Sequence, residues 1–362
     1  MDHIKRIFPA LALIIGISTS PVFAAPSDAQ ISSTMLKTIE NVIRPAYANF
    51  NAQTLTMSNI INQFCTSPNT KTLVNAQDQF TKVALSWASI ELFRSGPVMS
   101  DDRLERVLFY PDRKSTGLKQ VQRILVKKDP QSIAPETFEQ KSVAVQGLGA
   151  LEFILFGTGH EDLSNSEGAF RCDFANEIST NLAQIASDLN SMWSEDAAYS
   201  NLWANAGKPE SVFINNQEAI NELLGTVVHG LEAVKDIRIG AFLRNESNKD
   251  RPKSALFWRS ENTLPVLKAN LDFIQSLLNE GGLYSLAHKN SHIVDAIEFE
   301  IKQNKSAINA IDKPLFEALK DEKLRSKLCY FQTSLKFTIG RIDSEFAKDL
   351  GLSSGFSFSD GD

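Results

Sequence analysis

Apolar residues recur at intervals of three and four positions along most of this chain, which is the spacing of one face of an α-helix. No comparable stretch of strict polar–apolar alternation appears. Turn-forming residues fall between the apolar stripes, for example at Ser95-Gly96-Pro97 and at Asn279-Glu280-Gly281-Gly282. The stripes cover residues 36–64, 83–93, 178–193, 220–234, 264–278, 294–311 and 328–346. The pattern therefore predicts an all-α protein.

Helices of this kind usually bury their apolar stripes by packing as antiparallel bundles, and the pattern predicts about eight long helices. A chain of 362 residues is also long for a single core. The periodicity lapses around Asn205-Ala206-Gly207-Lys208-Pro209. We therefore predict two four-helix-bundle-like domains packed against each other, residues 25–205 and 206–362, the second ending in a non-helical tail.

The first 24 residues have the layout of a cleaved secretory signal peptide. Lys5 and Arg6 precede an apolar run from Ile7 to Ile17, and small residues follow as far as Ala24. No later stretch approaches the roughly twenty apolar residues that a membrane span needs. The sequence thus predicts an exported protein, periplasmic or associated with the outer membrane, with no transmembrane span in the mature chain.

Charge and motifs narrow the classes of function. The chain has 37 Lys plus Arg against 43 Asp plus Glu, a net charge of −6, and no basic block, which argues against nucleic acid as a partner. Neither a Gly-x-Ser-x-Gly nor a Walker sequence is present. In an oxidising compartment, Cys65, Cys172 and Cys329 predict one disulfide and one free thiol, with three pairings possible.

Several short segments, taken in their order and spacing, resemble the imelysin family. These are exported bacterial proteins that are linked to iron uptake and also classed as metallopeptidases. The resemblance spans nearly the whole mature chain and implies two helical bundles. It rests on Ile43-Arg44-Pro45-Ala46-Tyr47, Phe109-Tyr110-Pro111-Asp112, the run from Val145 to Phe153, Phe257-Trp258-Arg259-Ser260, the run from Leu350 to Phe356, and the terminal Asp360-Gly361-Asp362.

The family signature is Gly-x-His-x-x-Glu, which places an imidazole and a carboxylate on one helix face where they can share a metal ion. In this chain Gly147 and Glu152 match the signature, but Gly149 stands at the position of the histidine. The resemblance implies iron or another divalent metal as the cofactor. The turn itself offers one carboxylate and no nitrogen ligand, so we assign no metal-ligand set.

Glu152 lies in a strongly apolar stretch, where a carboxylate must be paired or hydrogen-bonded. It is either a buried packing device or a group that lines a cleft between the bundles. Arg94 and Arg259 are its candidate partners. His160, in the loop after this helix, could stand in for the missing histidine or could simply be solvated.

Gly147 and Gly149 disfavour a helix, which indicates close approach of a neighbouring helix or of a ligand. The leading functional hypothesis is a non-enzymatic envelope protein for bacterial iron uptake. It would bind an iron-containing ligand or an envelope protein partner at the cleft. The alternatives are a metallopeptidase and a purely structural adaptor.

Overall fold

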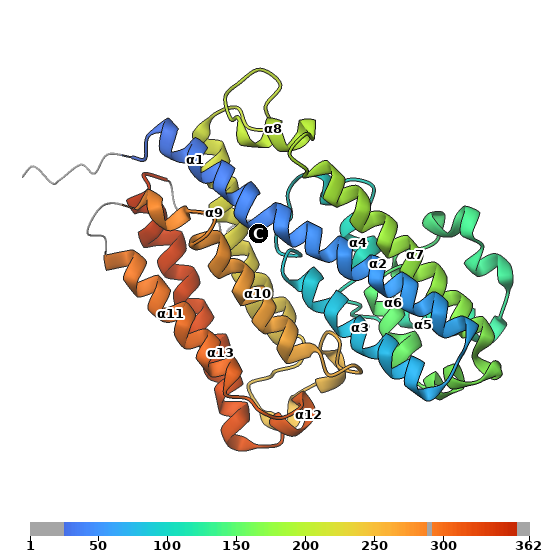
Figure 1. Ribbon diagram of the computed structural model, residues 1–362. Helices are drawn as coiled ribbons and strands as arrows, with labels where there is room; N and C mark the ends of the chain where they lie inside the picture. Colours follow the sequence, from blue (N-terminus) through green and yellow to red (C-terminus); the bar gives the residue numbers. More distant parts are fainter. Residues whose placement is uncertain (1–24, 288–291, 353–362) are drawn as a thin grey trace, which may run out of the picture.

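The computed structural model describes residues 25–287 and 292–352, and these residues form helices joined by loops, with no strand (Figure 1). The prediction of an all-α protein is confirmed. The predicted signal peptide, residues 1–24, and the terminal Asp360-Gly361-Asp362 lie outside the described residues. The α-helices are α1 (Asp28–Thr38), α2 (Arg44–Thr66), α3 (Thr70–Ala88), α4 (Arg103–Val107), α5 (Thr116–Lys127), α6 (Leu148–Phe156), α7 (Ala169–Met192), α8 (Ala198–Ala204), α9 (Asn216–Glu232), α10 (Thr263–Leu278), α11 (His292–Asn309), α12 (Leu315–Ala318), α13 (Glu322–Gly340) and α14 (Ala347–Asp349).

One group of helices is built around α2, which packs along α7 and α3. The apolar stripe of α2 faces these partners, and Tyr47, Phe50 and Phe64 are fully buried. A disulfide between Cys65 and Cys172 joins the end of α2 to the beginning of α7. The short helix α6 packs against α3, α5 and α7, which places Glu152 inside the molecule.

A second group contains α9, α10, α11 and α13. Helix α11 packs along α13, and α10 packs against both α9 and α11. Helix α1 contacts α9 and then continues through a π-helical turn, Ile39–Ile43, into α2 (Figure 1). One continuous helical segment is therefore shared by both groups, and the division into two bundles at residue 205 stays a prediction.

A buried polar cluster joins the two groups just after α3. The carboxylate of Glu91 accepts hydrogen bonds from Arg238, at 2.5 Å, and from the Asn270 side chain on α10, at 2.9 Å. The Arg238 guanidinium also lies over the ring of Tyr110, 4.6 Å from its centroid. Glu91 and Arg238 are both more than nine-tenths buried. Paired charges in such a place hold one arrangement of the helices, because separating them would leave a charge buried and alone.

Removing the disulfide should destabilise the first group of helices. The cross-link closes a loop of 107 residues, and loops of this length restrict the unfolded chain strongly. We expect the double variant Cys65→Ser, Cys172→Ser to lose about 2–5 kcal/mol of unfolding free energy in urea denaturation. Cys329→Ser, which removes the free thiol, serves as the control and should unfold like the wild type. Equal stability of all three proteins would contradict the expectation.

Candidate functional site

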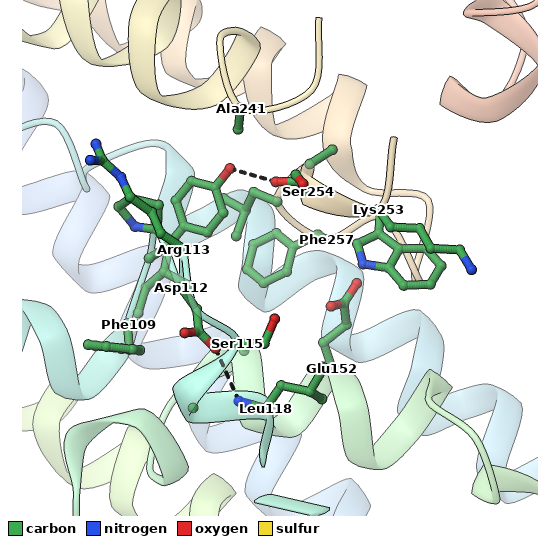
Figure 2. A pocket seen from close by; sticks show the side chains of 18 of the residues that line it. Phe109, Asp112, Arg113, Ser115, Leu118, Glu152, Ala241, Lys253, Ser254 and Phe257 are labelled. Atoms are coloured by element: carbon green, nitrogen blue, oxygen red, sulfur yellow. Dashed lines mark hydrogen bonds between the residues drawn. The ribbon is translucent and has the colours of Figure 1, made fainter. Parts of the chain in front are cut away.

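A cavity of about 530 Å³ lies between the two groups of helices (Figure 2). The first group lines it with the segment around 108–121 and the first turns of α6. The second group lines it with residues from 236–244 and 251–259. Segments that are far apart in the sequence thus form opposite walls. Its volume is within the range of small-molecule sites.

The two signature glycines of α6 have different structural roles. Gly147 precedes the helix in an extended conformation, and a Cβ there would collide with the backbone carbonyls of Arg106 and Val107. Gly149 is exposed and lines the cavity, and a Cβ there would meet no atom within 4 Å. Close backbone packing therefore explains Gly147. Gly149 instead leaves open space where the family signature has a histidine.

Glu152 lies one turn further along α6, and only 4% of its surface is exposed. Its Oε1 atom accepts three hydrogen bonds of 3.0 Å each, from the backbone N–H groups of Arg259 and Ser260 and from the Ser260 hydroxyl. Its Oε2 atom lies 3.7 Å from Nη1 of Arg259. The carboxylate thus connects α6 to the loop that precedes α10.

Burial raises the pKa of the Glu152 carboxyl above its usual range, because the charged form loses its contact with water. The hydrogen bonds from Ser260 and Arg259 and the charge of Arg259 act in the opposite direction and offset part of this increase. Burial likewise lowers the pKa of the Arg259 guanidinium, while the neighbouring Glu152 raises it.

The loop around Arg259 has an unusual backbone. Phe257 and Glu261 both have positive φ angles, 54° and 59°, which side chains other than glycine seldom adopt. This conformation brings two consecutive N–H groups to one carboxylate oxygen. The Arg259 guanidinium is held between aromatic rings, 4.4 Å from the centroid of Trp258 and 5.3 Å from that of Phe153.

Of the two candidate partners of Glu152, the structure brings only Arg259 to it. Arg94 is exposed and lines a separate cavity of about 390 Å³ beside α9. His160 contacts the carbonyl of Gly157, at 3.2 Å, and lies 3.5 Å from the Glu161 carboxylate. Neither side chain is among the residues that line the central cavity.

The donor set at Glu152 does not fit a metal ion. One carboxylate oxygen is fully engaged by hydrogen bonds, the other faces a guanidinium, and Gly149 supplies no imidazole. Within residues 25–287 and 292–352, there is no group of at least three His, Cys, Asp or Glu side chains that could hold a metal ion. The contacts that the structure shows at this site are hydrogen bonds, an ion pair and contacts of a guanidinium with aromatic rings.

Four basic residues that line the cavity were not identified from the sequence. They are Arg244, Arg251 and Lys253 in the segment between α9 and α10, and Arg113 in the loop before α5. Four basic residues within positions 244–253, three of which line the cavity, were a visible signal. Arg113 lies far from this segment in the sequence, so only the fold shows that it lines the same cavity.

Replacing each glycine by alanine should distinguish the closely packed position 147 from the open position 149. We expect Gly147→Ala to lower the midpoint of thermal unfolding, because the new Cβ collides with backbone carbonyls that cannot move cheaply. Gly149→Ala should leave the stability unchanged or raise it by up to about 1 kcal/mol, since alanine favours a helix over glycine. Circular-dichroism melting of both variants checks this. A large loss for Gly149→Ala would contradict the open space described here.

The raised pKa of Glu152 predicts a pH dependence of stability. The folded chain binds this proton more tightly than the unfolded chain. The free energy of unfolding should therefore fall as pH rises from the ordinary glutamate range through the raised pKa, and then level off. Urea denaturation between about pH 4 and about pH 8 measures it, with Glu152→Gln as the reference that lacks the titrating group. A wild type that gains stability relative to this variant with rising pH would contradict it.

Comparisons with known proteins agree with this architecture. The sequence profile of the imelysin family, peptidase family M75, matches residues 43–339. An imelysin-like protein from Psychrobacter arcticum 273-4 is similar in structure, with a TM-score of 0.76 and 17% identity over 92% of this chain and 99% of that one. A protein from Parabacteroides distasonis ATCC 8503 named "putative iron-regulated protein A precursor" gives a TM-score of 0.73 and 19% identity, over 89% and 96%. A search of curated proteins found no match. The chain belongs to the imelysin family.

Proposed function

We propose that this chain is an exported envelope protein that serves bacterial iron uptake by binding a ligand or a protein partner in the cavity between its two groups of helices. The observation that carries the proposal is the cavity of about 530 Å³ at Glu152, which both groups line. The signal-peptide layout of residues 1–24 supports export. Among the described residues, no helix is long and apolar enough to cross a membrane.

The link to iron is supported by family membership and by the name of the Parabacteroides distasonis protein, an iron-regulated protein A precursor. Iron enters this proposal as cargo, because the hydrogen-bonded Glu152 carboxylate is not arranged as a metal ligand. The residues that would contact the cargo are those with open faces in the cavity, Gly149 above all.

A variant that fills the cavity tests the proposal directly. Gly149→Trp places a large side chain in the open space beside Glu152, where a new Cβ meets no neighbour, so the fold should persist. We expect a deletion strain to grow poorly under iron starvation. The wild type and Gly149→Ala should restore growth, and Gly149→Trp should not. Melting curves of the purified variants verify folding. Normal growth of the deletion strain on every iron source would refute the proposal.

A metallopeptidase is the alternative that the family's classification implies. Mass spectrometry of the purified wild type and of Glu152→Gln separates the two functions. We expect no stoichiometric metal in either protein. Stoichiometric zinc or iron that disappears in Glu152→Gln, together with cleavage of peptides by the wild type, would replace our proposal by the enzymatic one.

A further inference from the structure

We propose that the central cavity takes a small polycarboxylate anion, free or as its ferric complex, and not a bare metal cation. This inference rests on the proposed function and names the class of ligand for the same site. It is carried by an excess of basic side chains around the cavity in a protein whose overall charge is negative.

The cavity is lined by five basic side chains and three acidic ones, whereas the whole chain carries a net charge of −6. The five are Arg113, Arg244, Arg251, Lys253 and Arg259. A cavity with walls of low dielectric focuses such a local excess and raises the concentration of ligands of opposite charge.

The three acidic side chains are already engaged by the protein. Asp112 accepts hydrogen bonds from the backbone N–H groups of Thr116, at 2.7 Å, and of Leu118, at 3.1 Å, at the start of α5. Figure 2 shows the bond from Leu118. Asp236 is paired with Lys235 at 2.8 Å. Glu152 is held by the loop around Arg259, as described above. Asp112 and Glu152 are therefore committed to contacts inside the protein, and Asp236 is the most exposed carboxylate of the three.

Three of the basic side chains are available to a ligand. Arg113, Arg251 and Lys253 are exposed, and in the described part of the chain no carboxylate lies within 4 Å of their charged groups. Arg244 is excluded from this count because its guanidinium donates to the carbonyls of residues 240, 241 and 243. The three exposed cations come from both walls of the cavity, Arg113 from the first group of helices and Arg251 and Lys253 from the second.

The remaining surface suits a compact organic anion. Phe109, Tyr110, Phe257 and Trp258 supply aromatic walls, and Lys253 lies over the ring of Trp258 at 5.8 Å. Gly149 and Ala150 bring the first turn of α6 to the cavity, and this helix end has no side-chain cap. Its partial positive charge adds to that of the basic side chains. A bare cation would meet repulsion from the basic side chains and from this helix end.

Isothermal titration calorimetry of the mature wild-type chain with citrate, with iron(III) citrate and with zinc chloride tests the ligand class. We expect saturable binding of at least one of the two citrate probes, weakening as salt is added. Zinc should not bind. The double variant Arg251→Glu, Lys253→Glu should weaken citrate binding by about ten-fold for each lost contact. Both residues lie on the surface, so the fold should not depend on them.

The matched control is Lys302→Glu, Lys336→Glu, which changes the net charge equally on exposed positions of α11 and α13 outside the cavity. This control should bind as the wild type does. Undiminished citrate binding by Arg251→Glu, Lys253→Glu, tight binding of zinc without binding of an anion, or no saturable binding of either citrate probe would each overturn the inference.

The binding experiment and the growth experiment can fail independently, so a wrong ligand class can be distinguished from a wrong role in iron uptake. Citrate binding that requires Arg251 and Lys253, in a strain whose growth is indifferent to iron, would uphold the ligand class and refute the iron role. A growth defect that Gly149→Trp fails to correct, without binding of either citrate probe, would uphold the iron role and refute the ligand class.

Discussion

The site depends on one buried carboxylate. Taking Glu152 out of water is costly, and the cost is tolerable only because its oxygen atoms find donors inside the protein. Those donors belong to a loop of the second group of helices, whereas Glu152 belongs to the first. The interaction therefore fixes the loop relative to α6. With the loop it fixes Trp258 and Arg259, which form one wall of the cavity.

A second polar cluster fixes the opposite side. Glu91, Arg238 and Asn270 form a buried set of charge-assisted contacts, and Arg238 also lies against Tyr110. Tyr110 lines the cavity and donates its hydroxyl to the carbonyl of Ser254, which lies on the wall formed by the second group. The cavity is thus bounded by two polar connections between the groups. Because each connection would leave a buried charge or polar group unpaired if it opened, the cavity has a defined shape before any ligand arrives.

The sequence was informative wherever a helix has one long apolar face. The stripe over residues 36–64 became α1, a π-helical turn and α2, and the stripes of α7, α9, α10 and α13 lie where the periodicity placed them. The sequence pattern did not predict short 3-10 segments such as Gly96–Met99 and Pro135–Gln140, because four to six residues are too few to show a helical period.

Prediction of the site was limited in another way. Apolar neighbours were enough to show that Glu152 needs a partner, but sequence offered Arg94 and Arg259 equally. Only the path of the chain distinguishes them. The basic residues around the cavity pose the same difficulty, since Arg113 and Arg251 become neighbours of one space only through tertiary packing. Disulfide pairing was open for the same reason, and the antiparallel contact of α2 with α7 selects Cys65 and Cys172.

The departure from the family signature changes what this turn of α6 can do. An imidazole at position 149 would project into the cavity and face the same side of α6 as Glu152, where the two could share a cation. Glycine leaves that volume empty, and Glu152 is committed to the loop of Arg259 and Ser260. With Arg113, Arg251 and Lys253 exposed at the cavity, the balance of charge at the proposed site favours an anion. The loss of a single side chain at position 149 thus removes one nitrogen donor from this turn of α6 and leaves its volume open.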